Sequence, residues 1–187
     1  MSKIDLQELL KEYESNLCDR IFRYETSDGY IMEVSFYREQ FCHLIGLQHI
    51  YDNDRRYLGA KGYNKIVSGN LTVNSLKNHD KKSFETGKER LMYFGEINEL
   101  MAHGEVIGFD VTKVQPRTRI QADFIIFKND TAHILHLFLR KENSKSDIYA
   151  PVSYVVKSLN DKAAKQYISN QKYKKIVKRS VIKREQP

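Results

Sequence analysis

Residues 132–141 read Ala-His-Ile-Leu-His-Leu-Phe-Leu-Arg-Lys and predict the central strand of the fold. Apolar side chains occupy both alternating sets of positions, so both faces of this strand would be buried. Three further strands are predicted around it, over 105–114, 120–128 and 149–157. Lys128-Asn129-Asp130-Thr131 is typical of a tight turn, and Pro151 opens the last strand, where a missing N–H is tolerated. The second half of the chain therefore predicts an antiparallel meander.

The first half of the chain mixes helices with one hairpin. Apolar spacing predicts helices over 4–17 and 39–51, and between them strands over 20–26 and 30–37 flank Ser27-Asp28-Gly29, a hairpin signal. Residues 52–104 contain several Gly and Asn residues that would end helices, and Thr72 could cap one of them. We interpret this region as a helical insert. After the meander, 160–169 is predicted as a short helix and 171–182 as a basic strand or helix.

These elements predict one α+β domain spanning 1–187, with helices packed on one face of a small antiparallel sheet. The other face of the sheet is expected to stay open. The 187 residues suffice for one hydrophobic core, and no apolar run is long enough for a membrane span. The N-terminus lacks a signal-peptide pattern, and the two cysteines, Cys18 and Cys42, lack metal-ligand spacing. A cytoplasmic protein with reduced thiols is the expectation.

Positive charge is concentrated at the C-terminus. The chain has a net charge of +7, yet residues 157–187 contain ten Lys or Arg against Asp161 and Glu185, so the rest is close to neutral. Such a segment is typical of a polyanion-binding edge, although a solvated basic tail is the simpler interpretation. Because tyrosines interleave with the charges, we favour an ordered element that binds RNA. Its predicted RNA-binding residues are Lys157, Tyr173, Lys174, Lys175, Lys178 and Arg179.

His43 is the main candidate for proton transfer. It lies in Phe-Cys-His-Leu-Ile-Gly-Leu (41–47), beside the apolar face that Phe41, Leu44 and Ile45 would form. A histidine at such an edge is either held by a hydrogen bond, which is the commoner case, or used as an acid or base near its ordinary pKa of about 6.5.

Cations and a hydroxyl gather near two strand ends. Alternation places His136 and Arg140 on one face of the central strand with Lys141 at its exit, and Ser153 and Lys157 on one face of the next strand. These groups suit phosphate binding, whereas the structural alternative is a solvated strand end. His133 and His136 are three residues apart and would point to opposite faces, so we expect no metal site and no cofactor. Phosphate-binding loops, GxSxG and CxxC are absent from the sequence.

Five segments together resemble a known family. They are FCHLIGL (41–47), ADFIIFK (122–128), HLFLRKE (136–142), YAPVSYVV (149–156) and YISNQKYKKIVKR (167–179). In order and spacing they resemble the fourth phage-associated group of the barnase–EndoU–colicin–RelE nuclease fold, over roughly 20–180. The resemblance implies metal-independent RNA cleavage on a small antiparallel sheet. It carries over His43 in a helix, Arg140 and Lys141 at a strand end, and Ser153.

Two functions from different classes follow. The first is a metal-independent endoribonuclease of a phage or mobile element, in which His43 is the general acid or base, Arg140 and Lys141 hold the phosphate, and Ser153 orients it. The second is a non-catalytic protein that binds RNA or a host or defence ribonucleoprotein, such as a CRISPR effector, and blocks it. A DNA-binding regulator ranks third because no helix-turn-helix pattern is present.

Overall fold

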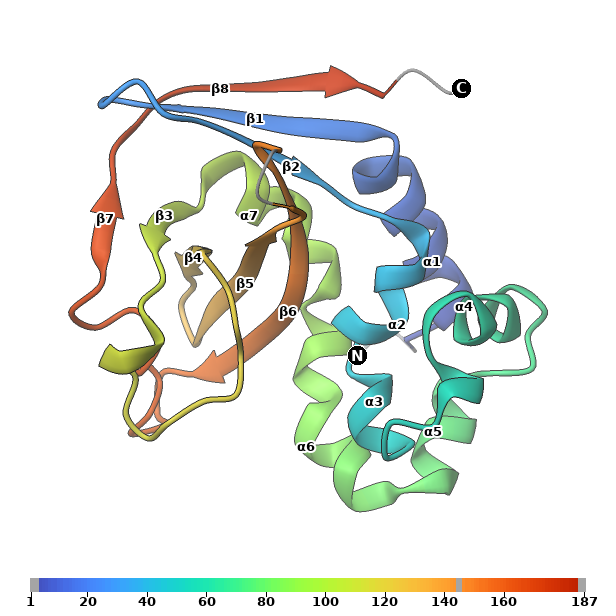
Figure 1. Cartoon of the computed structure of the whole chain (residues 1–187). Coiled ribbons are helices and arrows are strands. Elements are labelled where there is room, and N and C mark those ends of the chain that lie inside the picture. Colours follow the sequence, from blue (N-terminus) through green and yellow to red (C-terminus); the bar gives the residue numbers. More distant parts are fainter. Residues whose placement is uncertain (1–3, 144–145, 185–187) are drawn as a thin grey trace.

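The computed structural model describes residues 4–143 and 146–184, and it shows an α+β fold built on one eight-stranded sheet (Figure 1). The helices are α1 (Leu6–Tyr13), α2 (Phe41–Leu44), α3 (Leu47–Ile50), α4 (Gly59–Val67), α5 (Val73–His79), α6 (Lys81–Met92) and α7 (Ile97–His103). The strands are β1 (Arg20–Thr26), β2 (Ile31–Ser35), β3 (Glu105–Gly108), β4 (Phe124–Asn129), β5 (His133–Lys141), β6 (Ile148–Ser158), β7 (Lys172–Lys174) and β8 (Ile176–Lys183).

The sheet curls until it is nearly a barrel. Its strand order is β7-β3-β4-β5-β6-β2-β1-β8, so the two end strands, β7 and β8, are consecutive in the chain (Figure 1). Lys175 joins them, and its carbonyl accepts a hydrogen bond from the Ser27 N–H at 2.8 Å. The expectation of a small, purely antiparallel sheet was wrong on two counts. All eight strands form one sheet, and β2 pairs with β6 in parallel.

Both faces of the central strand are buried, as its sequence predicted. Leu135, Leu137 and Leu139 pack into the main core with the helices, whereas Ile134 and Phe138 belong to a second cluster on the opposite face. The expectation that this second face stays open was wrong. The segments 109–122 and 159–170 lie over it and bury side chains in the second cluster, namely Val114, Ala164 and Tyr167.

Three predicted elements differ in detail. The helix expected over 39–51 is divided into α2 and α3 at Gly46, whose φ of 88° breaks the helical path. The strand expected over 105–114 ends at Gly108, because Phe109 turns to pack edge-on against Phe138 at 5.3 Å. The segment 160–169 is a series of turns rather than a helix, and the Asp161 carboxylate accepts a hydrogen bond from the Ala163 N–H there.

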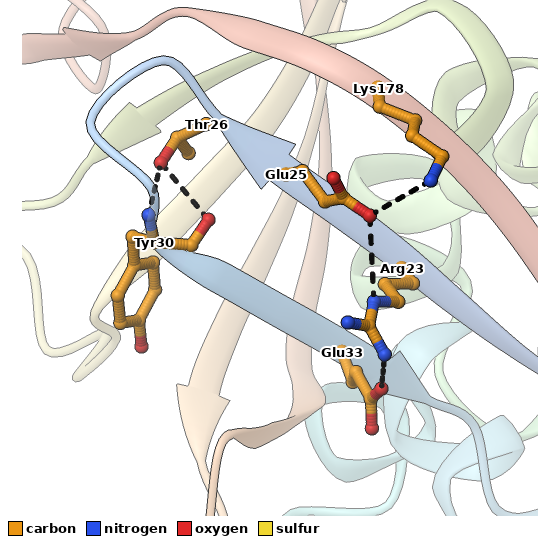
Figure 2. A network of polar contacts seen from close by, with 6 residues as sticks. All are labelled: Arg23, Glu25, Thr26, Tyr30, Glu33 and Lys178. Atoms are coloured by element: carbon orange, nitrogen blue, oxygen red, sulfur yellow. Dashed lines mark hydrogen bonds and ion pairs between the residues drawn. The ribbon is translucent and has the colours of Figure 1, made fainter.

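The β1–β2 hairpin forms at Asp28-Gly29 as predicted, and β8 continues it. Thr26 closes the turn through hydrogen bonds with the backbone of Tyr30 (Figure 2). Across the three strands the charges alternate from Glu33 to Arg23 (3.3 Å), from Arg23 to Glu25 (3.9 Å) and from Glu25 to Lys178 (3.3 Å) (Figure 2). Opposite charges on facing positions therefore support the register of β8 on β1.

Residues 52–104 contain helices, with Thr72 capping α5 as predicted. They are part of the main core rather than a separate layer, since Leu91, Phe94, Ile97 and Leu100 are buried in it. Cys18 and Cys42 are buried free thiols. Among the residues described, none of the helices has the length and apolar character needed to cross a membrane.

Candidate functional site at the free edge of β6

The candidate site begins at an irregularity in β6. Strand β2 pairs with β6 at Ile148 and Tyr149, and the helices α2 and α6 also contact β6. The register between β5 and β6 shifts here, because Phe138 pairs with Ser153 and the next residue, Leu139, pairs with Pro151. Val152 is therefore the extra residue of a bulge. The Val152 backbone lies close enough to His43 of α2 to raise the pKa of its imidazole. Bulges of this kind often re-aim side chains beside functional sites.

The turn between α2 and α3 brings three basic side chains together. Gly46 has a φ of 88°, and a Cβ at this position would lie 3.2 Å from Nη1 of Arg90 in α6. Glycine therefore serves both the left-handed backbone and the close approach of the guanidinium. His43 precedes this turn and His49 follows it, and both imidazoles lie near enough to Arg90 for its charge to affect them.

The electrostatics of this basic cluster (His43, His49 and Arg90) favour neutral imidazoles. Partial burial lowers the pKa of His43, the Val152 backbone acts in the opposite direction, and the Arg90 charge lowers it further. The pKa of His49 is lowered by burial and then by Arg90 and His43. Burial also lowers the pKa of Arg90, which nevertheless stays charged because an arginine does not deprotonate in proteins.

Arg90 has no partner for its charge within the described part of the chain. Its Nη1 is buried without a hydrogen-bond acceptor, and none of the ion pairs between described residues includes it. A buried donor of this kind is costly unless something accepts from it. The cluster is thus a ready site for an anion.

Arg90 lines a cleft of about 340 Å³ together with Ser153, and we call it the Ser153 cleft. One wall comes from α3 and α6, a second from β6, and a third from the segments that cover the second face. The remaining lining residues are His49, Thr86, Gly87, Glu89, Thr118, Arg119, Ile120, Val155, Val156, Lys157 and Tyr167. Ser153 and Lys157 were predicted from strand alternation, and the Lys157 ammonium is 3.2 Å from Asp161.

Arg140 and Lys141 do not line this cleft, contrary to the expectation that they share it with Ser153 and His43, and His43 is absent from its lining as well. Arg140 is exposed on β5 opposite Ala150, on the face that carries Phe138. The Lys141 ammonium is 3.2 Å from Asp147, and its backbone N–H donates to the Asp123 carboxylate. Alternation along β5 directs these two neighbouring side chains to opposite faces at the strand end.

The predicted RNA-binding residues of β7 and β8 lie away from the cleft. In Figure 1, β8 crosses the top of the molecule, whereas α3 and α6 lie at the bottom. Lys174 is 3.2 Å from Asp28 and Lys178 is paired with Glu25, so both charges are partly compensated. Arg179 donates to the Gly104 carbonyl at 2.6 Å, while Lys175 is exposed and Tyr173 is 57% exposed.

His133 and His136 point to opposite faces of β5, as strand alternation predicted. His133 packs against Tyr93 on the helical side, and His136 packs against Phe138 and Tyr167 on the other. Within the residues that the structure covers, no three His, Cys, Asp or Glu side chains are grouped so as to hold a metal ion.

Sequence reasoning missed His49 and Arg90. A signal for His49 was present, since His43 and His49 flank Gly46 at equal spacing in the sequence. Arg90 had no local signal, because it lies in a charged stretch of the helical region and becomes special only when Gly46 packs against it.

Comparison with known proteins identifies the class. A family model described as phage-Barnase-EndoU-ColicinE5/D-RelE like nuclease 4 matches residues 5–186, nearly the whole chain. The molecule with this curled sheet and basic cleft is therefore a nuclease of the barnase–EndoU–colicin–RelE type. Within that class the chain belongs to the fourth phage-associated family, as its five segments predicted. No curated protein and no solved structure matches the chain.

Proposed function

We propose that this nuclease is an endoribonuclease that cleaves RNA through attack of the 2′-hydroxyl on the adjacent phosphorus, without a metal ion. The observation that carries the proposal is the basic cluster beside Ser153, in which Arg90 has a buried Nη1 without an acceptor. Intramolecular attack supplies its own nucleophile, so the protein needs only a base, an acid and cations at the non-bridging oxygens.

The two histidines divide the proton transfers. His43, whose lowered pKa keeps it neutral near pH 7, accepts the proton of the 2′-hydroxyl as the new P–O2′ bond forms. His49, charged in the substrate complex because a phosphate raises its pKa, donates a proton to O5′ as the P–O5′ bond breaks. The products are a 2′,3′-cyclic phosphate and a free 5′-hydroxyl. The same two groups then return to their starting protonation by exchange with water.

The cations of the Ser153 cleft bind the scissile phosphate. Arg90 offers a bidentate fork, and Ser153 adds a hydroxyl donor on the neighbouring strand. Lys157 and Arg119 contribute positive charge at the rim. Arg140, which is exposed on β5 outside the cleft, contacts a phosphate farther along the RNA, and Lys141 adds positive charge at the same strand end.

The test is cleavage of an end-labelled RNA in EDTA. The parent chain should cut it and leave a 2′,3′-cyclic phosphate, and a single 2′-deoxy substitution at the cut position should abolish that cut. His43→Gln and His49→Gln should each lower kcat by about 10²–10⁴-fold. Arg90→Lys should lower kcat/KM by about 10²-fold, because lysine keeps the charge but loses the fork.

His103→Gln is the matched control. His103 is exposed on α7 beside Glu99 and outside the cleft, so its loss should leave cleavage within about twofold of the parent. Tight, salt-sensitive RNA binding without any cleavage would overturn the enzyme and favour the second function, a non-catalytic protein that binds RNA or a ribonucleoprotein.

A further inference from the structure

A second cavity adjoins the Ser153 cleft. It has a volume of about 470 Å³ and lies between α3 and α6, and we call it the α3–α6 pocket. Four residues line both spaces, namely His49, Thr86, Gly87 and Arg90. The two cavities are therefore neighbours that share a wall of one helix turn of α6.

The two cavities differ in character. The α3–α6 pocket is walled by Ile45, Ile50, Phe84 and Leu91, with Ser83 and Lys82 as polar groups. Apolar walls with a few hydrogen-bonding groups, in a volume of this order, are typical of pockets for small organic ligands. The Ser153 cleft, by contrast, gathers Arg90, Arg119 and Lys157. The cleft suits an anionic group, and the pocket suits a flat apolar group. A nucleotide contains both, as its phosphate and its base.

Gly87 stands where the two cavities meet. It lies in the interior of α6, where glycine is a poor choice because it weakens the helix relative to alanine. Its φ is not positive, and no heavy atom lies within 4 Å of the place where its Cβ would be. Neither the backbone nor crowding requires glycine here. What its missing side chain does provide is open space between the pocket and the cleft.

We propose that the α3–α6 pocket binds a nucleobase of the RNA whose phosphate occupies the Ser153 cleft, and that Gly87 keeps the passage between them open. The proposal rests on the proposed function, which it deepens by adding a base-binding subsite. The base inserts between the apolar walls, Ser83 and Lys82 face its polar edge, and Arg90 lies between base and phosphate.

Calorimetry of ligand binding to the full chain tests the proposal. The ligands are the four 3′-nucleoside monophosphates, the four nucleosides and inorganic phosphate. At least one nucleotide should bind the parent tenfold more tightly than phosphate does. Gly87→Leu should remove that preference, so that no nucleotide binds the variant more tightly than phosphate does. Gly87→Ala, which adds only a methyl group, should reduce the preference severalfold and raise the melting temperature because α6 gains a better helix former.

Lys88→Leu is the matched control, because it adds the same apolar side chain to the next position of α6, on the exposed surface outside both cavities. It should bind every ligand as the parent does. Nucleotides that bind no more tightly than phosphate, or a folded Gly87→Leu variant that binds them like the parent, would overturn the proposal.

The outcomes separate the subsite from the proposed function. If RNA is cleaved and phosphate binds through Arg90 while nucleotides gain nothing from their bases, the subsite fails and the enzyme stands. If RNA is not cleaved but a nucleoside binds the parent and is lost in Gly87→Leu, the subsite stands and the catalytic proposal fails.

Discussion

Two kinds of histidine occur in this chain, and burial separates them. His43 is an exposed residue of α2 near the Val152 backbone. His136 is fully buried, and its Nδ1 lies 3.3 Å from the Val155 carbonyl oxygen. Burial lowers the pKa of His136 to about 4. Its Nε2 has no hydrogen-bond partner among the described residues, so a proton there would be an uncompensated charge.

The His136 pKa predicts acid destabilisation. The folded pKa lies below the ordinary value of about 6.5, so between these values the unfolded chain binds more protons and stability rises with pH. The contribution is complete above about pH 6.5 and is lost toward pH 4, by about 3 kcal/mol in total. His136→Leu should remove this slope. Urea unfolding of both proteins at pH 4.5 and 7 measures it, and equal losses of stability on acidification would contradict the assignment.

At the scale of elements, the segment α2–Gly46–α3 is a short unit with two tasks. Its apolar side chains, including Phe41, Leu44 and Leu47, are buried in the main core. Its polar side, with His43 and His49, faces outward beside Arg90. Gly46 allows both, because its left-handed conformation turns the chain between the two helices and its missing Cβ leaves room for the Arg90 guanidinium.

Gly46→Ala is expected to affect both stability and activity. A non-glycine residue in the left-handed region costs about 1–2 kcal/mol, and the new Cβ displaces Arg90. Gly29→Ala is the matched control, since Gly29 has a φ of 80° but nothing within 4 Å of its Cβ position. Thermal melts should show similar losses for both variants. RNA cleavage per folded molecule should fall at least tenfold for Gly46→Ala alone, and equal activity of the two variants would contradict the placement of Arg90.

At the scale of the whole molecule, the positive charge is divided between two surfaces. His49 and Arg90 of the basic cluster line the Ser153 cleft, whereas in Figure 1 β8 crosses the top of the molecule and β7 lies at its left side. The net charge of +7 is therefore not one continuous patch. Acidic partners such as Asp28 and Glu25 compensate part of the C-terminal charge. We infer that this strand pair adds affinity for distant phosphates of a long RNA rather than chemistry.

Replacing Lys174, Lys175 and Lys178 with glutamine is expected to flatten the salt dependence of RNA binding. Release of counterions from three phosphates would reduce the slope of log K against log salt by about 2 for a single strand. Cleavage of a dinucleotide, too short to reach β8, should be unchanged. Lys11, Lys61 and Lys77, exposed in the helical part, provide a control with the same change of charge. An equal effect of both triple variants would place the RNA contacts elsewhere.

Arg179 of β8 differs from the three lysines because its guanidinium is held by the protein. It was predicted to bind RNA, and its guanidinium donates to the Gly104 carbonyl and lies over the Tyr24 ring at 5.8 Å. A substitution there would disturb the contact of β8 with the end of α7 as well as any RNA contact, so it is left out of the triple variant.

The sequence by itself determined the features that depend on local patterns. The apolar run of 132–141 specified a strand buried on both faces, and Asp28-Gly29 specified a hairpin, because neighbouring positions alone decide strand alternation and turn geometry. The position of His43 at the rim of an apolar face also followed from helical spacing. The five family segments, read in order, determined the nuclease class.

Tertiary structure alone decided how these pieces meet. The sheet gains its last strand because β8 pairs with β1 across about 150 residues of chain, and no local pattern encodes such a pairing. The same long-range packing covers the second face, brings Arg90 of α6 under Gly46 and leaves Lys141 paired with Asp147 outside the cleft. A side chain's charge and type are properties of the sequence, whereas its partners depend on which distant segments the core brings together.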